Sequence, residues 1–416
     1  MNKELLDHIL AAMIDTDDGV SDLLFVVGKP PHVELHGHLH AMETDPPGLG
    51  LTHPQITAMG KILMNGNKRL EDDYLINGSC DCSYAIPEAR FRVNFFRQNN
   101  NPAIVMRKLN SAIPTMQKLN LPPVFKNIIK EKNGIIFVTG GTGSGKTTTL
   151  AAMLNEINEN QSCHIITLED PIEFLHPHKK SIFCQRELGK DYNTFPNGLR
   201  AALRQAPKVI LVGEIRDRET MEIAMTAAET GHVVFSTLHT INAGQTINRI
   251  LGMFTREEEP LIRQRLAETL RYVISQRLVT KIEGGRHLIT EIMGSSLSTR
   301  EAMLYGEKDG RTFQDIIEAA VPQGWHSFDQ ELLHAVENGI VTEESAMLYC
   351  NIKNKMSREL DSLRNQRGSK DASFQESGLR IQQEPKPAPA PPAAPAGAPV
   401  PEKLGLQPLT TGRING

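Results

Sequence analysis

The chain has 416 residues, enough for two domains and a terminal tail. Hydrophobic residues make up 39 % of it and charged residues 23 %, which is typical of a soluble globular protein. The formal net charge of −4 provides no strong field for nucleic acid or for an anionic membrane. Acids interrupt the apolar N-terminus, and no apolar run approaches the roughly 20 residues of a spanning helix, which excludes a secretion signal and a membrane anchor.

Residues 1–110 are predicted to form an N-terminal domain of mixed helix and strand. Apolar spacing indicates a helix near Leu5, and the run from Leu23 indicates a strand that ends at the breaker cluster 28–31. Prolines in residues 111–133 predict a linker to a second domain.

A hairpin is expected about Gly37, because polar and apolar residues alternate on both sides of it. His36, His38 and His40 alternate along this hairpin, so a metal clip is conceivable, but solvated histidines are the simpler interpretation. Two further strands, beginning at Arg90 and Ala103, carry several arginines.

The five cysteines are scattered and odd in number, which indicates reduced thiols in the cytoplasm. Cys80 and Cys82 form a close pair, but no second pair completes the four ligands of a zinc site. We therefore predict no metal there.

Residues 134–360 are predicted to form an α/β domain. Short apolar runs at 135–139, 164–168, 209–212 and 232–237 have the composition of buried parallel strands, and helical patterns separate them. This alternation implies a parallel sheet covered on both faces. Residues 259–279 are predicted to form one long amphipathic helix.

Residues 361–416 are predicted to form a disordered tail. Their Pro/Ala-rich part, from about Glu384, has no means of burying a core.

The segment after the first strand of the α/β domain fits the phosphate-binding pattern G-x-x-x-x-G-K-[ST] at every position. Glycines allow backbone N–H groups to surround phosphate oxygens at the start of a helix, the lysine reaches the β- and γ-phosphates, and the threonine hydroxyl binds Mg²⁺. We expect ATP and Mg²⁺ as cofactors. The predicted nucleotide-binding residues are Gly140, Gly141, Thr142, Gly143, Ser144, Gly145, Lys146, Thr147 and Thr148.

Carboxylates follow two of the predicted strands, at the sheet edge that faces this loop. Glu214 can accept a proton from, or orient, the attacking water. Glu169 and Glu173 are both candidates to bind Mg²⁺ through water, and spacing does not choose between them. His239 ends a strand at the same edge, where it can sense the γ-phosphate, and His232 begins that strand.

Four ordered segments, GGTGSGKTTT, LEDPIEF, LVGEIRDRET and GHVVFSTLHT, resemble the P-loop, Asp box, Walker B and His box of the secretion ATPases. The resemblance covers about residues 5–355. It implies a RecA-like P-loop ATPase domain behind a smaller, PAS-like N-terminal domain, which SDLLFVVGKPP and RFRVNFFRQ resemble.

Within this family the chain resembles the PilT/PilU branch of type IV pilus retraction ATPases. Pilus extension and type II secretion members carry a zinc-binding C-x-x-C pair, which this chain lacks. Residues 295–310 depart from a segment that marks PilT, which suggests a PilU-like character.

The resemblance also implies roles for individual residues. Lys146 and Thr147 match the P-loop lysine and the Mg²⁺ ligand, Glu214 the catalytic glutamate, Glu169 the Asp-box acid, and His239 and His232 the His-box pair. Arginines that reach the nucleotide of a neighbouring subunit come from the N-terminal domain in this family, and solvated surface arginines are the alternative. The candidates are Arg90, Arg92, Arg97 and Arg107.

The resemblance implies a cytoplasmic homo-hexameric motor, peripheral at the inner-membrane pilus base, that acts on a platform protein to retract the pilus and drive twitching motility. It acts alone or as an accessory to a PilT-type partner. The alternatives are a pilus extension or type II secretion ATPase and an ATP-binding accessory interaction protein. A nucleic-acid translocase is disfavoured by the charge.

Overall fold

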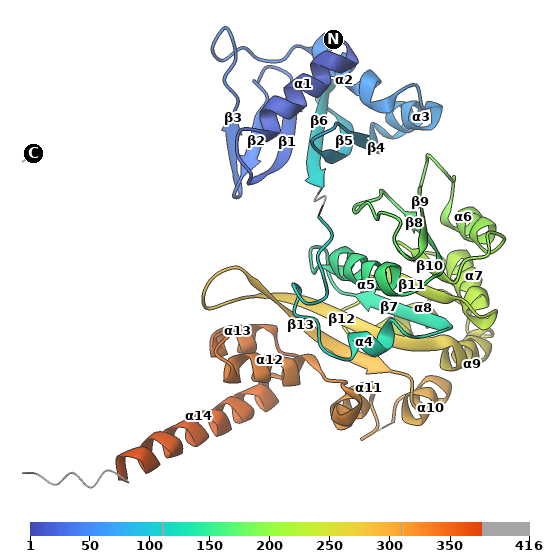
Figure 1. Cartoon of the computed structure of the whole chain (residues 1–416), viewed down its shortest axis with the longest axis vertical. Helices are drawn as coiled ribbons and strands as arrows, with labels where there is room; N and C mark the ends of the chain where they lie inside the picture. The colour runs from blue at the N-terminus through green and yellow to red at the C-terminus, as the bar shows by residue number, and fades with distance from the viewer. Residues whose placement is uncertain (110–111, 309, 377–416) are drawn as a thin grey trace, which may run out of the picture. The chain divides into compact units, whose positions relative to one another are not determined.

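Two β-sheets organise the residues that the computed structural model describes, which are 1–109, 112–308 and 310–376 (Figure 1). The first sheet is antiparallel, with the strand order β3-β2-β1-β6-β5-β4. Its strands are β1 (Val20–Val26), β2 (His32–Leu35), β3 (His38–Ala41), β4 (Ser79–Ala85), β5 (Arg90–Gln98) and β6 (Asn101–Leu109).

Three helices cover one face of this sheet, and their apolar side chains form a single core with it. They are α1 (Lys3–Ile14), α2 (His53–Met64) and α3 (Lys68–Asn77). Alternate residues of β5, such as Phe91 and Phe95, enter the core, so the intervening Arg92 lies on the opposite face. The predicted hairpin about Gly37 is confirmed, because β2 and β3 pair on either side of it.

The second sheet has the order β13-β12-β7-β11-β10-β8-β9 and is parallel except for β13. Its strands are β7 (Gly134–Thr139), β8 (His164–Glu169), β9 (Ile182–Glu187), β10 (Val209–Val212), β11 (Val233–Leu238), β12 (Leu270–Thr280) and β13 (Arg286–Gly294). The predicted α/β fold with a parallel sheet is therefore confirmed.

Both faces of the second sheet are buried. Ile135 and Phe137 of β7 pack with α7 (Arg218–Glu229) and α9 (Glu259–Thr269), whereas Ile136 and Val138 pack with α5 (Lys146–Asn160) on the other face. This burial on both faces explains why the strands read as continuous apolar runs. The other helical elements are α4 (Phe125–Ile128), α6 (Phe195–Ala202), α8 (Ala243–Leu251), α10 (Leu297–Tyr305), α11 (Phe313–Ala319), η1 (Val321–Gln323), α12 (Phe328–Glu337), α13 (Glu343–Tyr349) and α14 (Lys353–Glu376).

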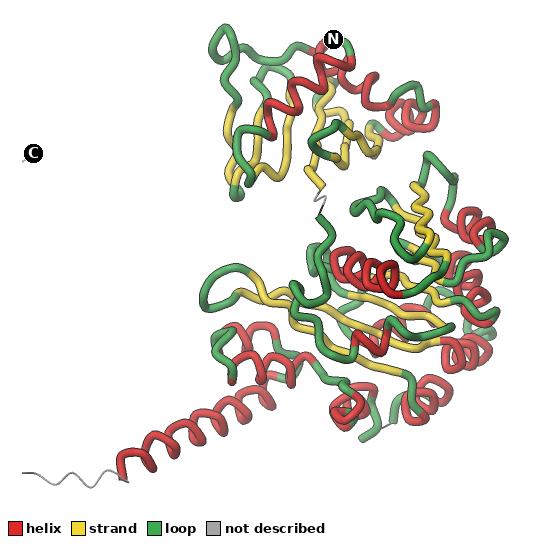
Figure 2. Tube along the Cα trace, in the orientation of Figure 1, coloured by secondary structure: helices red, strands yellow, loops and turns green. Residues whose placement is uncertain are grey.

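The predicted long helix over residues 259–279 is wrong in its second half. Helix α9 ends at Thr269, and the chain continues directly as β12 (Figure 2). Val273 and Ile274 enter cores on opposite faces of the sheet, which one stripe of a helix does not allow. As an inner strand, this segment has both edges paired with β7 and β13 and both faces covered by the two cores, and this overrides the helical spacing.

The end of the chain is only partly described. The sequence predicts a disordered tail from residue 361, but α14 continues to Glu376. The remaining residues of the predicted tail, 377–416, lie outside the described residues. The predicted domain boundaries stay a prediction.

Within the described parts of the chain, no helix combines the length and the apolar character that would cross a membrane.

Burial raises the pKa of the Cys80 thiol to about 11. His38 and His40 lie on the exposed strand β3. No group of three or more His, Cys, Asp or Glu side chains in these same parts is arranged to hold a metal ion.

Glu291 of the edge strand β13 is a buried carboxylate. Its Oε1 accepts a hydrogen bond of 2.9 Å from the N–H of Ala243, the first residue of α8. Burial raises the pKa of Glu291 from 4.5 to about 7, although this hydrogen bond and the charge of Arg277 act in the opposite direction. Folding therefore takes up a proton in this pH range. The stability that Glu291 contributes is present below its unfolded pKa and is lost as the pH rises through about 7.

We predict that the free energy of unfolding of the wild type falls relative to that of Glu291→Gln between about pH 5 and about pH 8. The expected change is on the order of 2–3 kcal/mol, since each pKa unit corresponds to about 1.4 kcal/mol. Urea unfolding of both proteins across this range measures it. Glu283→Gln, in the exposed hairpin between β12 and β13, controls for the loss of a carboxylate. A wild-type curve that stays parallel to that of Glu291→Gln would contradict the prediction.

Candidate active site

The loop between β7 and α5 adopts a conformation that requires glycine. Gly140, Gly143 and Gly145 have φ values of 143°, 76° and 89°, which residues with a side chain rarely adopt. A Cβ atom on Gly140 would lie 2.5 Å from Ser144 Oγ and 2.6 Å from the carbonyl oxygen of Gln276. Gly145 is the residue before the first turn of α5, so the positive end of that helix faces the loop. The loop can therefore hold phosphate groups.

Lys146 begins α5 and folds back over this loop. Its Nζ donates hydrogen bonds to the carbonyl oxygens of Gly140 (2.8 Å) and Gly141 (2.9 Å). Burial lowers the pKa of Lys146, while the charges of Glu214 and Glu173 act in the opposite direction. A phosphate group would offer this ammonium group a stronger acceptor than two neutral carbonyls.

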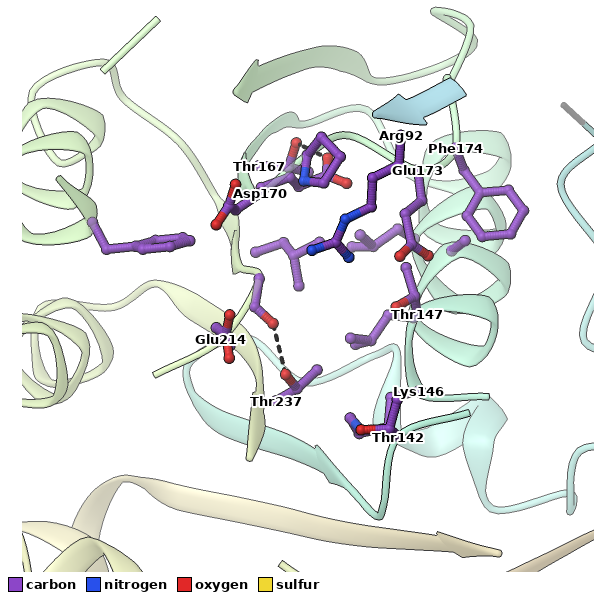
Figure 3. Close-up of a pocket in the computed structure, with 18 of the residues that line it drawn as sticks. Arg92, Thr142, Lys146, Thr147, Thr167, Asp170, Glu173, Phe174, Glu214 and Thr237 are labelled. Atoms are coloured by element: carbon purple, nitrogen blue, oxygen red, sulfur yellow. Dashed lines mark hydrogen bonds between the residues drawn. The ribbon is translucent and has the colours of Figure 1, made fainter. Parts of the chain in front are cut away.

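A cavity of about 340 Å³ opens beside the loop, and all the predicted motif segments contribute to its walls (Figure 3). The cavity lies between α5 and the carboxyl ends of the parallel strands. Ligands bind at this position in folds of this class. The polar lining residues include Arg92, Thr142, Lys146, Thr147, Thr167, Glu169, Asp170, Glu173, Glu214, Arg216, Thr237 and His239.

Glu214 lies in this cavity two residues after β10. Thr237 Oγ1 donates a 2.7 Å hydrogen bond to the carbonyl oxygen of Gly213, which holds this turn against β11 (Figure 3). Arg216 Nη2 lies 2.5 Å from Glu214 Oε1. The other oxygen, Oε2, is buried, and no residue in the described ranges gives it a hydrogen bond. Glu214 Oε2 therefore keeps a lone pair that no described protein group uses.

His239 lies beside the same carboxylate, with its Nε2 3.8 Å from Glu214 Oε2. Burial lowers the pKa of His239, and the nearby charge of Lys146 lowers it further. The imidazole is therefore neutral near pH 7. A neutral ring at this position can donate or accept one hydrogen bond toward a terminal phosphate.

The structure distinguishes Glu169 from Glu173, which the sequence offered equally as candidates to bind Mg²⁺. Glu169 is buried, and its Oε1 accepts hydrogen bonds from Thr167 Oγ1 (2.6 Å) and Gln185 Nε2 (3.0 Å). Burial raises the pKa of Glu169 to about 7. Glu173 instead points from its loop toward Thr147 in Figure 3, and its charge acts on Lys146. The geometry thus favours Glu173 over Glu169 for direct approach to a phosphate-bound ion.

The four candidate arginines lie in different surroundings. Arg92 lines the cavity of its own chain, and Arg90 Nη1 is buried without a hydrogen-bond partner in the described ranges. Arg97 stacks over the Tyr74 ring at 4.7 Å. Arg107 Nε forms an ion pair of 2.9 Å with Asp22. Only Arg92 of this set reaches the cavity.

His232 lies apart from the other candidates. It precedes β11, whereas His239 follows that strand, so the length of the strand, about 20 Å, separates them. The Nδ1 of His232 forms a 2.9 Å hydrogen bond with the carbonyl oxygen of Ala227. The structure does not bring His232 to the cavity.

The lining residues that were not predicted include Asp170, Arg216 and Thr237. Arg216 follows Glu214 by two positions, and an arginine at that distance can reach back to the carboxylate. This spacing could have predicted Arg216 as a site residue. Thr237 acts through the backbone of Gly213, and the sequence carries no signal of that contact.

Comparison with known proteins identifies the family. The family model described as a type II/IV secretion system protein matches residues 57–341. The type IV pilus retraction ATPase PilT of Pseudomonas aeruginosa is 41 % identical over 329 residues, which cover 79 % of this chain and 93 % of PilT. The type IV pilus ATPase PilU of the same organism is 34 % identical over 354 residues, 84 % of this chain and 90 % of PilU.

A crystal structure of the pilus retraction motor PilT with bound ADP has a TM-score of 0.75 and 38 % identity to this chain, covering 85 % of it and 98 % of that chain. The predicted family, the RecA-like ATPase fold and nucleotide binding are thereby confirmed. The identity to PilT exceeds that to PilU, so it does not favour the predicted PilU-like character, which stays a prediction from residues 295–310. The chain belongs to the type II/IV secretion system protein family, among its type IV pilus retraction ATPases.

Proposed function

We propose that this protein hydrolyses ATP with Mg²⁺ in a homo-hexameric ring on the cytoplasmic side of the inner membrane, and that the ring powers type IV pilus retraction. The observation that carries the chemistry is the unpartnered Oε2 of Glu214 in the same cavity as Lys146. Glu214 orients the attacking water and accepts its proton, while Lys146 offsets the charge of the phosphoryl oxygens. The reaction then requires positioning and charge, and no covalent intermediate.

The cavity also offers a donor set that suits Mg²⁺. The Thr147 hydroxyl and the carboxylates of Glu173 and Glu169 are hard oxygen ligands, and Mg²⁺ prefers such oxygens together with phosphate and water. Thr147 would hold the ion directly, and one of the two acids would hold it through water. When bound, Mg²⁺ neutralises charge on the β- and γ-phosphates.

Motion follows from closure of the N-terminal domain on the nucleotide. Arg92 comes from the first sheet, whereas the other polar groups that line the cavity come from the second domain. Hydrolysis and loss of the γ-phosphate remove a charge that groups from both domains contact. This shifts the equilibrium between two arrangements of the N-terminal domain relative to the second domain. A head-to-tail ring would pass that shift to a platform protein in the inner membrane.

A second role, as an accessory to a PilT-type partner, is supported by the departure of residues 295–310 from the PilT pattern. In this role the chain hydrolyses ATP but contributes to retraction only in the presence of that partner.

The test combines purified protein and cells. The full chain should release phosphate from ATP in a Mg²⁺-dependent reaction and run as a hexamer in native mass spectrometry, with Lys146→Ala as the inactive control. A strain that lacks the gene should keep its surface pili but lose twitching, alone or in a background without its PilT-type partner. Cells without pili would point to an extension motor instead. Absence of turnover both alone and with the partner would sink the proposal.

A further inference from the structure

The loop between β8 and β9 presents Glu173 to the phosphate-binding residues, and one side chain of β9 holds that loop at three points. Gln185 Nε2 donates hydrogen bonds to the carboxylate of Glu169 (3.0 Å) and to the carbonyl oxygen of Phe174 (2.8 Å). Its Oε1 accepts the N–H of His176 at 2.8 Å. The amide thus uses both of its donors and its acceptor, which leaves one orientation of the group possible.

The three contacts of Gln185 enclose Glu173. One lies before it in the chain, at Glu169, and two lie directly after it, at Phe174 and His176. The backbone of Glu173 also acts on the Glu169 carboxyl, whose pKa it lowers against the larger effect of burial. The backbone of Glu173 is therefore held from both sides.

The position of Gln185 follows from the strand register. It lies directly opposite Thr167 of the parallel strand β8, and both side chains donate to Glu169 Oε1. The carboxylate of Glu169 thus links β8 and β9 at the start of the loop through these two hydrogen bonds. Glu173 remains the acid that faces Thr147 and Lys146.

We infer that Gln185 is a positioning residue for ATP hydrolysis, which acts by holding Glu173 at the distance where it serves the Mg²⁺ of the bound nucleotide. This inference rests on the proposed function. Gln185 itself does not line the cavity. Its effect therefore passes through the loop, in the way that outer groups orient the ligands of a metal site.

The alternative is that Gln185 only stabilises the fold of the loop and has no effect on Mg²⁺ binding. A matched control variant distinguishes this structural role from the positioning role. Asn158 of α5 holds the next part of the same loop through Nδ2 to the carbonyl oxygen of Pro177 (2.7 Å) and Oδ1 from the N–H of Lys179 (3.3 Å). Asn158 does not line the cavity either. Gln185→Met and Asn158→Leu each keep the side-chain volume and remove the hydrogen bonds.

The first measurement is nucleotide binding, with a fluorescent ATP analogue in EDTA and in a Mg²⁺ titration. Gln185→Met should bind the analogue in EDTA within about twofold of wild type, since the loop 140–147 is unchanged. Its half-saturating Mg²⁺ concentration should rise about tenfold and its kcat fall about 10- to 100-fold. Asn158→Leu should keep the wild-type Mg²⁺ response even where it lowers the melting temperature.

The second measurement is a double-mutant cycle with Glu173→Gln. If Gln185 acts through Glu173, adding Gln185→Met to Glu173→Gln should lower kcat by less than about twofold further. Gln185→Glu, which keeps the acceptor for His176 and loses both donors, replaces Gln185→Met if the latter does not fold. Additive losses, or a Mg²⁺ response like that of Asn158→Leu, would overturn the inference. Failure of the proposed function is distinct, because the wild type itself would then show no turnover.

Discussion

Glu214→Gln should lower ATP turnover by about 10²-fold or more while leaving nucleotide binding intact. Gln has nearly the shape of Glu but accepts no proton, so the change removes the base and spares the cavity. Oε2 of Glu214 is the atom concerned, because Oε1 is already paired with Arg216. Phosphate release gives kcat, and a fluorescent ATP analogue gives Kd.

Glu219→Gln is the matched control for this prediction. Glu219 lies on α7, five residues after Glu214, and forms an exposed ion pair with Arg200. Its loss should change turnover by less than about twofold, since exposed pairs contribute little. If Glu214→Gln keeps turnover within about threefold of wild type, another group is the base.

The phosphate-binding loop and Glu214 were predictable because their signals are local. A buried strand, a glycine-rich turn and a helix start follow one another within residues 134–150, and each has its own composition. Glu214 follows a buried strand in the same way. Parallel strands end at one edge of a sheet, so the sequence placed these groups together without any long-range contact.

The failures come from features that depend on contacts far apart in the sequence. Helical spacing continues through Leu270, but β12 is a strand because β7 and β13 lie on either side of it. The spacing along the sequence did not show which of Glu169 and Glu173 approaches the Mg²⁺ ion. That depends on Gln185, which hydrogen-bonds Glu169 and belongs to β9, a strand that the sequence did not predict. Arg92 could be named as a candidate, but the sequence does not distinguish it from Arg97 and Arg107. Arg107 lies directly opposite Arg92 in the sheet, and only its ion pair with Asp22 sets it apart.

Arg92→Ala should lower turnover by about 10²-fold or more, because an arginine beside the transferring phosphoryl group offsets charge that develops in the transition state. Arg92 lines the cavity. Burial raises the pKa of Asp170, and the charge of Arg92 acts against this rise. Arg97→Ala is the control from the same strand. Its guanidinium stacks on Tyr74, so turnover should stay within about threefold of wild type. Similar losses for both variants would mean that strand β5 matters only for folding.

Rings assembled from two different mutant subunits show whether Arg92 acts on the nucleotide of its own subunit or on that of a neighbour. The sequence predicts action across the subunit boundary, whereas in the structure Arg92 lies at the cavity of its own chain. We therefore expect that Arg92→Ala subunits mixed with Lys146→Ala subunits recover no activity, because every site then lacks one of the two cations. If the arginine came from the neighbour, about a quarter of the sites in a random one-to-one ring would hold both groups. Recovery toward that level, in rings shown by native mass spectrometry to be mixed, would assign Arg92 to the neighbouring site. The N-terminal domain would then close on the adjacent subunit, and each hydrolysis step would change the boundary between two chains.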